Sequence, residues 1–503
     1  MDLLLKIVKT VNFYLSDYIL VILLVGVGLF FTIRTRFVQV RCFGEGIKQV
    51  FGGLSLKGKK GGGGLSSFQA LATAIAAQVG TGNIVGASSA ILAGGPGAIF
   101  WMWVIAFLGM ATNYAEAVLA QKTKVVDANG EIHGGPVYYI KKAFTGKAGK
   151  FLAGFFAVAI TIALGFIGAM VQSNSITSNV AGVFNSFNVN IENYLWVIGI
   201  VIAALAAVIV IGGVKRIASV TEKLVPVMAI LYLLGGILVL CVNIKNVPAA
   251  FGIIFKYAFV PQAIIGGGFG AAIVKAIQKG AQRGLFSNEA GMGSTPHAHA
   301  QADVKDPHDQ GVCAMIGVFI DTFVVLTMTA LIVFVTLYTG DGPLVGLVGG
   351  AESFSDLASS QAGLNSGNMV QNAFALTFGK LFGATAGNVI GSIFVAVCLF
   401  FFAFSTIISW NFFGKVNFDY LFGKKALIVY SIVSIGCVFL GSIGSNDLVW
   451  GLSDLFNNLM VIPNVMALFA LGAMVYGRFQ KKEICAEGSV NAEKEEAEEN
   501  VEA

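Results

Sequence analysis

The sequence predicts an all-α membrane protein that crosses the bilayer many times. Of its 503 residues, 56% are hydrophobic and 12% are charged, and the mean hydropathy is +0.80. Soluble proteins carry about 25% charged residues, so a single soluble core is excluded. The short alternating segments of a β-barrel are not visible. The net charge of +5 does not indicate a nucleic-acid partner, because the basic residues gather in particular loops.

Apolar stretches separated by polar loops predict about eleven membrane spans, since ~20 apolar residues cross a hydrocarbon core of ~30 Å. The seventh is the least regular. The spans lie near 17–36, 66–93, 97–121, 151–181, 194–213, 224–243, 263–297, 311–338, 384–411, 426–444 and 456–477.

Basic residues predict the orientation of these spans. A basic loop follows every odd-numbered span, with Lys305 after the seventh and Lys279 and Arg283 just inside the end of that span. The stretches 182–193 and 339–370 contain neither lysine nor arginine. Cytoplasmic loops carry the excess of positive charge. We therefore expect a multi-pass cell-membrane protein with its N-terminus outside and its C-terminus in the cytoplasm.

The second span should not be a continuous helix. Its middle, 76–83, reads AAQVGTGN, where lipid would favour leucine and isoleucine. Glycine costs a helix ~1 kcal/mol relative to alanine, and an unpaired backbone group costs several kcal/mol in hydrocarbon. Close helix packing through small residues is the alternative, but it does not require the glutamine, threonine and asparagine.

A weak internal repeat divides the chain. The seventh span is interrupted by GGGFG at 266–270, five spans after the break in the second. One N-terminal span followed by two sets of five predicts an inverted repeat with discontinuous helices. The expected segments are an N-terminal helix and linker (1–64), two five-helix repeats (65–243 and 244–444), a last transmembrane helix (445–482) and a disordered acidic tail (483–503).

Oxygen atoms from two spans predict a sodium site. The first half of the second span should end with free carbonyls from Ala76 to Val79. In the ninth span, the Phe402 carbonyl and the hydroxyls of Ser405 and Thr406 share one helix face, because their spacing is i, i+3, i+4. Alternatively, the two hydroxyls only bond back to the preceding turn.

The start of the second half-helix predicts a carboxylate site. Thr81, Gly82 and Asn83 follow the break, where free N–H groups and the helix dipole favour an anion. In the fourth span, Gln172 is the deepest residue of a polar run and our candidate for a substrate contact. The alternative for that run is the exit of the span into water.

Two acidic residues lie within predicted spans, where charges are costly and usually paired or functional. We expect Glu116 to accept N–H groups from the broken backbone of the second span. Asp321 is either a proton or cation site or a partner for a neighbouring helix, with Lys275 as its candidate ion-pair partner.

No nucleophile–base arrangement, phosphate loop or dinucleotide fingerprint is present in the sequence, so we expect neither an enzyme nor a cofactor. The polar cluster 287–293 and its neighbouring histidines lack ligands at metal spacing. We interpret the cluster as a cytoplasmic hinge and expect no metal other than the coupling ion.

Four segments resemble the alanine/glycine:cation (sodium) symporter family: PGAIFWMW at 96–103, AQVGTGNIVG at 77–86, HGGPVYYI at 133–140 and AQRGLFSNEAG at 281–291. The resemblance covers about residues 15 to 480. It implies a LeuT-type fold, sodium-coupled uptake of alanine and glycine, and a substrate site between spans two and seven. It adds Gln78, Phe269 and Gly270 to the expected substrate contacts.

The predicted function is therefore sodium-coupled symport of small neutral amino acids by a monomer. Proton coupling through Asp321 is the alternative within transport. A sensor or a channel is the alternative outside this class. The acidic tail is too short for a signalling domain, and no ring of like charges indicates a channel filter.

Overall fold

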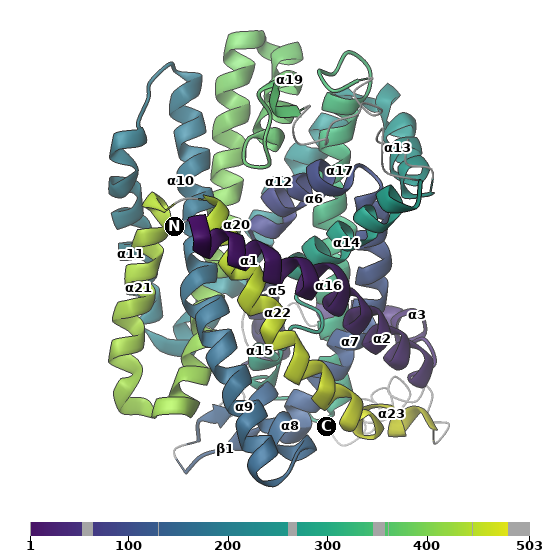
Figure 1. Cartoon of the computed structure of the whole chain (residues 1–503), viewed down its shortest axis with the longest axis vertical. Helices are drawn as coiled ribbons and strands as arrows, with labels where there is room; N and C mark the ends of the chain where they lie inside the picture. The colour runs from purple at the N-terminus through teal and green to yellow at the C-terminus, as the bar shows by residue number, and fades with distance from the viewer. Residues whose placement is uncertain are drawn as a thin grey trace, which may run out of the picture.

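A computed structural model describes residues 2–52, 64–128, 130–259, 269–345, 358–360, 362–444 and 446–480. These residues form a bundle of helices with one two-stranded hairpin (Figure 1). In the hairpin, β1 (Val125–Val126) pairs antiparallel with β2 (Ile132–His133). The predicted acidic tail at 483–503 lies outside the described residues.

The first half of the chain contains the N-terminal helices and the first set of predicted spans. Segments marked η are short π- or 3-10-helical stretches. In order they are α1 (Asp2–Tyr14), η1 (Leu15–Leu20), α2 (Val21–Arg34), α3 (Val38–Arg41), α4 (Phe43–Gly52), α5 (Ser67–Gln78), η2 (Gly82–Gly86), α6 (Ala87–Gly94), α7 (Ala98–Thr123), α8 (Pro136–Ala143), α9 (Gly146–Ile160), η3 (Thr161–Gly168), α10 (Ala169–Ser186), η4 (Glu192–Tyr194), α11 (Leu195–Val210) and α12 (Gly213–Val242).

The second half contains the remaining spans and the C-terminal helices. They are η5 (Ile244–Asn246), α13 (Val247–Phe259), α14 (Phe269–Asn288), α15 (Pro296–Ala300), α16 (Pro307–Val318), η6 (Phe319–Leu326), α17 (Thr327–Val333), η7 (Phe334–Tyr338), α19 (Met369–Phe382), α20 (Ala384–Phe422), η8 (Lys424–Ala426), α21 (Leu427–Ile443), α22 (Asn446–Ala470) and α23 (Gly472–Gln480). Helices α13 and α19 lie between predicted spans and were not predicted as elements.

The prediction of a polytopic helical membrane protein is confirmed. Among the described residues, nine helical segments are long and apolar enough to cross a membrane, and the bent pair α5 and η2–α6 makes up to ten. They correspond to ten of the predicted spans. The exception is the seventh, because its main helix α14 carries three charges, on Lys275, Lys279 and Arg283.

The long helices surround the broken ones. Figure 1 shows α1 and α22 crossing the near face of the bundle side by side, with α11 beside α21 at one edge. Helix α20 packs against α5, α10 and α19, and α7 packs against α14 and α16. The elements of the two predicted repeats are thereby interleaved, and both broken spans lie against long continuous helices.

The predicted break in the second span is confirmed. Helix α5 ends at Gln78, and the axis of the following segment, which begins at Gly82, is turned by 46°. Val79 has φ −80° and ψ 87°, which is not helical. Its N–H still bonds to the Ile75 carbonyl at 2.7 Å, so the helix ends in a closed last turn.

Most of the predicted break in the seventh span, at 266–268, lies outside the described residues, and the last two residues of the GGGFG run open helix α14. Among the described residues, the chain leaves the helix at 289–295, between α14 and α15. Glu289, Gly291 and Gly293 have φ of 58°, 90° and 80°. Left-handed positions end a helix, and glycine adopts them without a steric cost. The cluster that we interpreted as a cytoplasmic hinge is therefore the break itself.

Candidate functional site

Local sequence explains where α5 begins and ends. At its start, the Ser66 hydroxyl accepts the Gln69 N–H, and the Gln69 side chain accepts the Ser66 N–H, both at 3.1 Å. This capping box satisfies two helix-end donors. Alanines then favour the helix until Gly80, and the last carbonyls of α5 face α20 without helical partners.

Four members of the predicted sodium set lie together. The Thr406 hydroxyl bonds to the Ala76 carbonyl at 3.0 Å, to the Ala77 carbonyl at 3.4 Å and to the Phe402 carbonyl at 3.0 Å. The Ser405 hydroxyl bonds to the Ala76 carbonyl at 3.3 Å and to the Phe402 carbonyl at 2.8 Å. The hydroxyls thus make the back-bonds that we considered as the alternative, and they also face α5.

Val79 is the fifth predicted member of the sodium set, and its side chain is buried. The contacts between α5 and α20 given above use the carbonyls of Ala76 and Ala77, and Val79 takes part in none of them. The Cβ position of Gly80 lies 2.4 Å from Thr406 Oγ1, so a glycine is needed for this close approach.

Side-chain oxygens meet the predicted carboxylate site. The Gly80 N–H donates to Asn83 Oδ1 at 3.0 Å, and the Thr81 N–H donates to Gln172 Oε1 at 3.1 Å. All four residues are buried. The structure therefore brings Gln172 from α10 to the break. The N–H groups of Gly80 and Thr81 are not free here, because side-chain oxygens accept them. Binding of a carboxylate at this point stays a prediction.

The second broken span approaches the first through the C-terminal end of α14. The Gln78 amide donates to the Asn288 carbonyl at 2.7 Å, and the Cβ position of Gly82 lies 3.0 Å from Ser287 Cα. The sequence did not single out Ser287 or Asn288 as site residues. The signal that could have found them is the polar run SNE at 287–289, which is followed closely by two glycines.

Phe269 and Gly270 do not join this group. They open α14, and the Phe269 side chain lies outside the described part of the chain. Ser287 follows Phe269 by eighteen positions along the helix, a rise of about 27 Å at ~1.5 Å per residue. The physical reason is that the break near the second span lies at the other end of α14.

Asp321 joins the two broken spans. Its Oδ1 accepts the Asn83 amide at 2.6 Å, and its two carboxylate oxygens accept the Ser287 hydroxyl at 3.1 and 3.0 Å. Thr322, the next residue, donates its hydroxyl to Oδ2 at 2.8 Å. The carboxylate is fully buried. Asp321 is thus a partner for neighbouring helices, whereas Lys275, our candidate ion-pair partner, is exposed on α14.

Glu116 holds the other break, so our prediction for it was wrong in its target. Its Oε2 accepts the Gly291 N–H at 3.0 Å, and its Oε1 accepts the Gly293 N–H at 2.9 Å. Asn464 of α22 donates to Oε1 at 2.7 Å. None of these three partners of Glu116 belongs to the second span. Helix α7 packs against α14 and α16, and this places Glu116 beside the seventh span and not the second.

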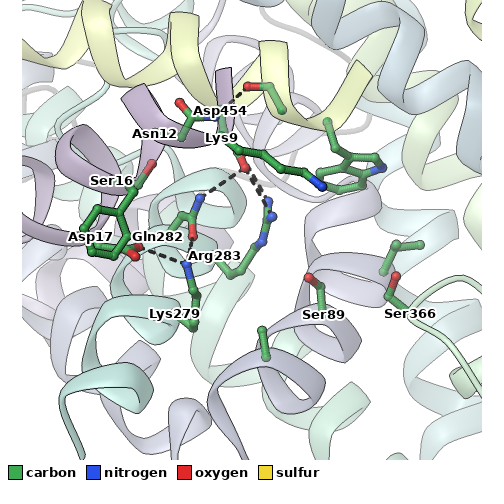
Figure 2. A pocket seen from close by; sticks show the side chains of 15 residues that line it. Lys9, Asn12, Ser16, Asp17, Ser89, Lys279, Gln282, Arg283, Ser366 and Asp454 are labelled. Carbon is green, nitrogen blue, oxygen red and sulfur yellow. Dashed lines mark hydrogen bonds and ion pairs between the residues drawn. The ribbon is translucent and has the colours of Figure 1, made fainter. Parts of the chain in front are cut away.

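A cavity of about 460 Å³ lies next to the second half of the first broken span (Figure 2). Val85, Ser89 and Ala93 line one side of it, and α1, η1, α14 and α22 provide the other sides. Trp450 also lines the cavity and has the Arg283 guanidinium 5.0 Å from its ring centre.

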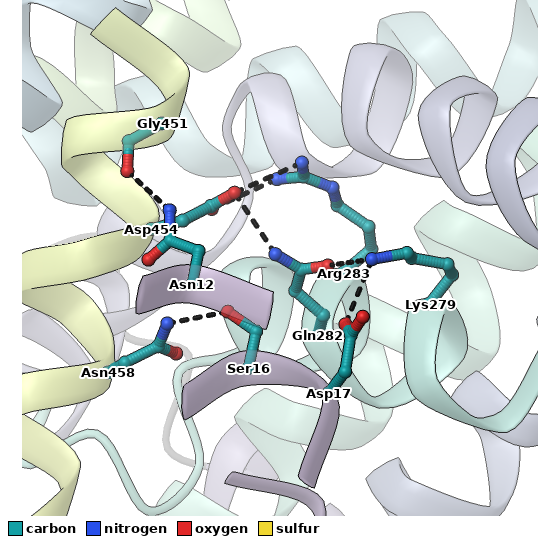
Figure 3. Close-up of polar contacts among 9 residues, drawn as sticks. All are labelled: Asn12, Ser16, Asp17, Lys279, Gln282, Arg283, Gly451, Asp454 and Asn458. Carbon is teal, nitrogen blue, oxygen red and sulfur yellow. Dashed lines mark hydrogen bonds and ion pairs between the residues drawn. The ribbon is translucent and has the colours of Figure 1, made fainter. Parts of the chain in front are cut away.

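Two ion pairs connect α14 to its neighbours at this cavity (Figure 3). Lys279 pairs with Asp17 of η1 at 2.9 Å, and Arg283 pairs with Asp454 of α22 through two contacts of 3.1 and 3.2 Å. From the sequence we placed Lys279 and Arg283 just inside the cytoplasmic end of the seventh span, and this sidedness stays a prediction.

Comparison with known proteins identifies the family. The family model described as the sodium:alanine symporter family matches residues 1–493. The chain belongs to the sodium:alanine symporter family. The sodium/alanine symporter AgcS of Methanococcus maripaludis is 39% identical over 471 residues, covering 93% of this chain and 95% of AgcS. The amino-acid carrier protein AlsT of Bacillus subtilis is 39% identical over 467 residues, covering 92% of this chain and 89% of AlsT.

The fold of this symporter-family chain also has a solved counterpart. The crystal structure of MhsT in complex with L-phenylalanine aligns with a TM-score of 0.55 at 16% sequence identity, and it covers 80% of this chain and 88% of MhsT. At this identity the similarity establishes the fold alone. The predicted LeuT-type fold is thereby confirmed.

Proposed function

We propose that this chain is a sodium-coupled symporter that imports alanine and glycine by alternating access, and that it acts as a transporter and not as an enzyme. The observation that carries the proposal is the meeting of Ala76, Ser405 and Thr406 across the break in the second span. The family of the chain, and the names of its relatives, support sodium and alanine as the cargo.

Sodium binds between α5 and α20 in this proposal. The carbonyls of Ala76 and Phe402 and the hydroxyls of Ser405 and Thr406 are neutral oxygen ligands, and the Val79 carbonyl is the remaining candidate. Carbonyls freed at a helix break coordinate sodium in transporters. Each hydroxyl gives up one hydrogen bond to a carbonyl, so the ion itself connects the two helices.

The amino acid binds at the start of the second half-helix. Its carboxylate replaces side-chain oxygens at the N–H groups of Gly80 and Thr81, which the helix dipole makes favourable for an anion. Phe286 Cδ1 lies 3.3 Å from the Cβ position of Gly82, so an aromatic ring limits the space next to the break. This crowding favours a substrate with a small side chain.

Movement of one bundle opens the site alternately to the two sides. The bundle consists of the second, third, seventh and eighth spans. Helix α7 of the third span packs against α14 of the seventh span and α16 of the eighth. At 100 mV, one sodium ion supplies ~2.3 kcal/mol of electrical work in addition to its concentration gradient. The proposal includes a monomer in the cell membrane, with its N-terminus outside, its C-terminus in the cytoplasm, and no nucleic-acid partner and no cofactor. It also keeps the predicted division into segments.

Uptake of labelled alanine into proteoliposomes tests the proposal. We expect uptake to require external sodium, and Ser405→Ala and Thr406→Val to weaken its apparent sodium affinity by about tenfold or more. Ser409→Ala is the matched control, because Ser409 is a buried serine one turn further along α20 and outside the sodium contacts. Equal sodium dependence in all three variants would sink the assignment of this ion site.

Proton coupling is the second candidate, because Asp321 is a fully buried carboxylate at the junction of the broken spans. Replacing sodium by choline at a fixed pH distinguishes the two. Uptake that continues in choline and follows an inward proton gradient would support proton coupling and exclude obligatory sodium coupling.

A further inference from the structure

Three side chains of metal-ligand type meet where the linker after the first span contacts the start of the eighth span. Cys42 and Glu45 belong to the linker, and His308 lies in the first turn of α16. The Cys42 sulfur, a Glu45 carboxylate oxygen and a His308 ring nitrogen all lie within 4.8 Å of one another. None of these residues takes part in the contacts between α5 and α20 given above.

The fold of the linker places its two residues on one side. The Gly46 N–H bonds to the Cys42 carbonyl at 2.9 Å, so the first turn of α4 begins at Cys42. Residues three apart on a helix are neighbours, and Cys42 and Glu45 therefore share a face. The Cβ position of Gly46 lies 2.7 Å from Ile316 Cγ1, so a glycine is needed for the close approach of α4 to α16.

His308 is oriented through one ring nitrogen and offers the other. Its Nδ1 lies 2.6 Å from the Tyr114 hydroxyl, and its Nε2 lies 3.2 Å from Glu45 Oε1. The residue is only 3% exposed, yet its Nε2 has no hydrogen-bond partner among the described residues. Metal-binding histidines usually donate their other N–H to a fixed oxygen. When Nδ1 donates to the Tyr114 oxygen, the lone pair of Nε2 is directed at Glu45 and is available to a metal ion.

The third side chain changes with the redox state. Cys42 is fully buried and forms a disulfide, whereas the four other cysteines in the described part of the chain are free. In the proposed orientation the linker faces the cytoplasm, where cellular thiols keep most cysteines reduced. Two such thiols reduce the disulfide to two thiols and are themselves joined in a disulfide. Cys42 then carries a thiol whose proton is released when the sulfur binds a metal ion.

We propose that reduced Cys42, Glu45 and His308 bind a zinc ion. Zinc takes thiolate sulfur, imidazole nitrogen and carboxylate oxygen in a tetrahedral arrangement, and three protein ligands leave a fourth position for water. Neighbouring ligand atoms in such a site are ~3.5 Å apart, which is close to the distance between Glu45 and His308. Magnesium and calcium prefer oxygen ligands alone, so the sulfur and the nitrogen favour zinc.

The bound ion connects the linker to the eighth span. The reverse thiol exchange, with a cellular disulfide as the oxidant, re-forms the disulfide of Cys42 and releases the ion. The ion is therefore regulatory and takes no part in the binding of sodium or the amino acid. The inference goes beyond the proposed function. Local spacing could not reveal the site, because its residues lie in distant parts of the chain.

Zinc binding to the purified full chain, before and after reduction with a phosphine, tests the proposal. We expect one zinc ion per chain after reduction and none before it, counted by mass spectrometry once free ions are removed. Cys42→Ser and His308→Ala should abolish this binding. Cys241→Ser and His133→Ala are the matched controls and should preserve it, because Cys241 is an exposed free cysteine and His133 belongs to a separate cluster at the hairpin. No zinc after reduction, equal zinc before and after reduction, or one zinc ion in Cys42→Ser would overturn the site.

Milder variants keep the test valid if Cys42→Ser or His308→Ala does not fold. Glu45→Gln changes a partly exposed side chain and Tyr114→Phe retains the ring, and each should weaken zinc binding by about tenfold or more. Unchanged affinity in both variants would contradict the proposed ligands.

Cobalt(II) gives a readout of the sulfur ligand itself. Charge transfer from a thiolate to cobalt produces a strong near-ultraviolet absorption, which we expect in the reduced wild-type protein and not in Cys42→Ser. The same absorption in Cys42→Ser would overturn the role of this cysteine. None of these measurements uses amino-acid uptake, so a failure of the proposed function is distinguishable from a failure of the zinc site.

Discussion

The two broken spans differ in what their irregular backbone does. In the second span the break is short, the carbonyls of Ala76 and Ala77 face α20, and the N–H groups of Gly80 and Thr81 face side-chain oxygens. In the seventh span the break covers 289–295 and contains three left-handed residues. Glu116 holds it through backbone N–H groups. One break presents groups that can exchange partners, and the other is fixed by a buried side chain.

This difference explains why the two breaks suit different tasks. Backbone groups that bond to hydroxyls and amides can transfer those bonds to an ion or an amino acid at little net cost, because one hydrogen bond replaces another. Backbone groups held by a buried carboxylate cannot be released without leaving the charge unpaired. We expect variants of the seventh span to affect folding and variants of the second to affect transport.

The largest expected effect is at Glu116. In Glu116→Leu, the N–H groups of Gly291 and Gly293 and the amide of Asn464 lose their acceptor. Each unsatisfied donor costs about 1–3 kcal/mol, so the free energy of unfolding should fall by about 3 kcal/mol or more. The measurement is thermal unfolding of the purified protein in detergent. Glu222→Leu on α12 is the control, since Glu222 accepts only the Gln69 amide among the bonds described for it. Equal stability of the two variants would contradict the role of Glu116.

The next largest effect is on transport, at Gly80. A Cβ atom in Gly80→Ala would lie 2.4 Å from Thr406 Oγ1 and 3.2 Å from Gln172 Oε1. It would separate α5 from α20 at the proposed sodium site, so apparent sodium affinity should fall by about tenfold or more. The neighbouring Gly86→Ala provides the control, because its Cβ would meet no atom nearer than 3.8 Å. Sodium titration of alanine uptake compares them, and equal affinities would exclude a close contact at this point.

A smaller effect is expected at the side of α14 that faces the cavity. Arg283→Gln removes the two contacts with Asp454 and the ring contact with Trp450, at a cost of about 2 kcal/mol in the free energy of unfolding. The second half of the second span cannot form a comparable ion pair, because η2 and α6 contain no charged residue. Asp454→Asn should cost less in the Arg283→Gln background than alone. Additive losses in this double-mutant cycle would show that the pair is not coupled.

Particular residues show how much of the site could be predicted. The residues that α5 and α20 bring together could be predicted from the chain, because a break at 79–80 and hydroxyls at Ser405 and Thr406 follow from local spacing. Gln172 could be selected for its depth in a span. Local spacing does not predict whether Phe269 and Gly270 lie near the substrate, and the structure places them at the start of α14, at the opposite end from the break. Glycine runs alone did not locate the second break, because glycine also opens helices and fills close contacts.

By itself, the sequence determined that this is a helical membrane protein with a second span that opens between Gln78 and Gly82. Composition and helix propensity act over a few residues, and they suffice for such features. Only the tertiary structure decided that Glu116 holds Gly291, 175 residues away, and that Asp321 meets Asn83, 238 residues away. The partner of a buried charge depends on how the helices pack, and helix packing brings together residues whose local sequences carry no mark of one another.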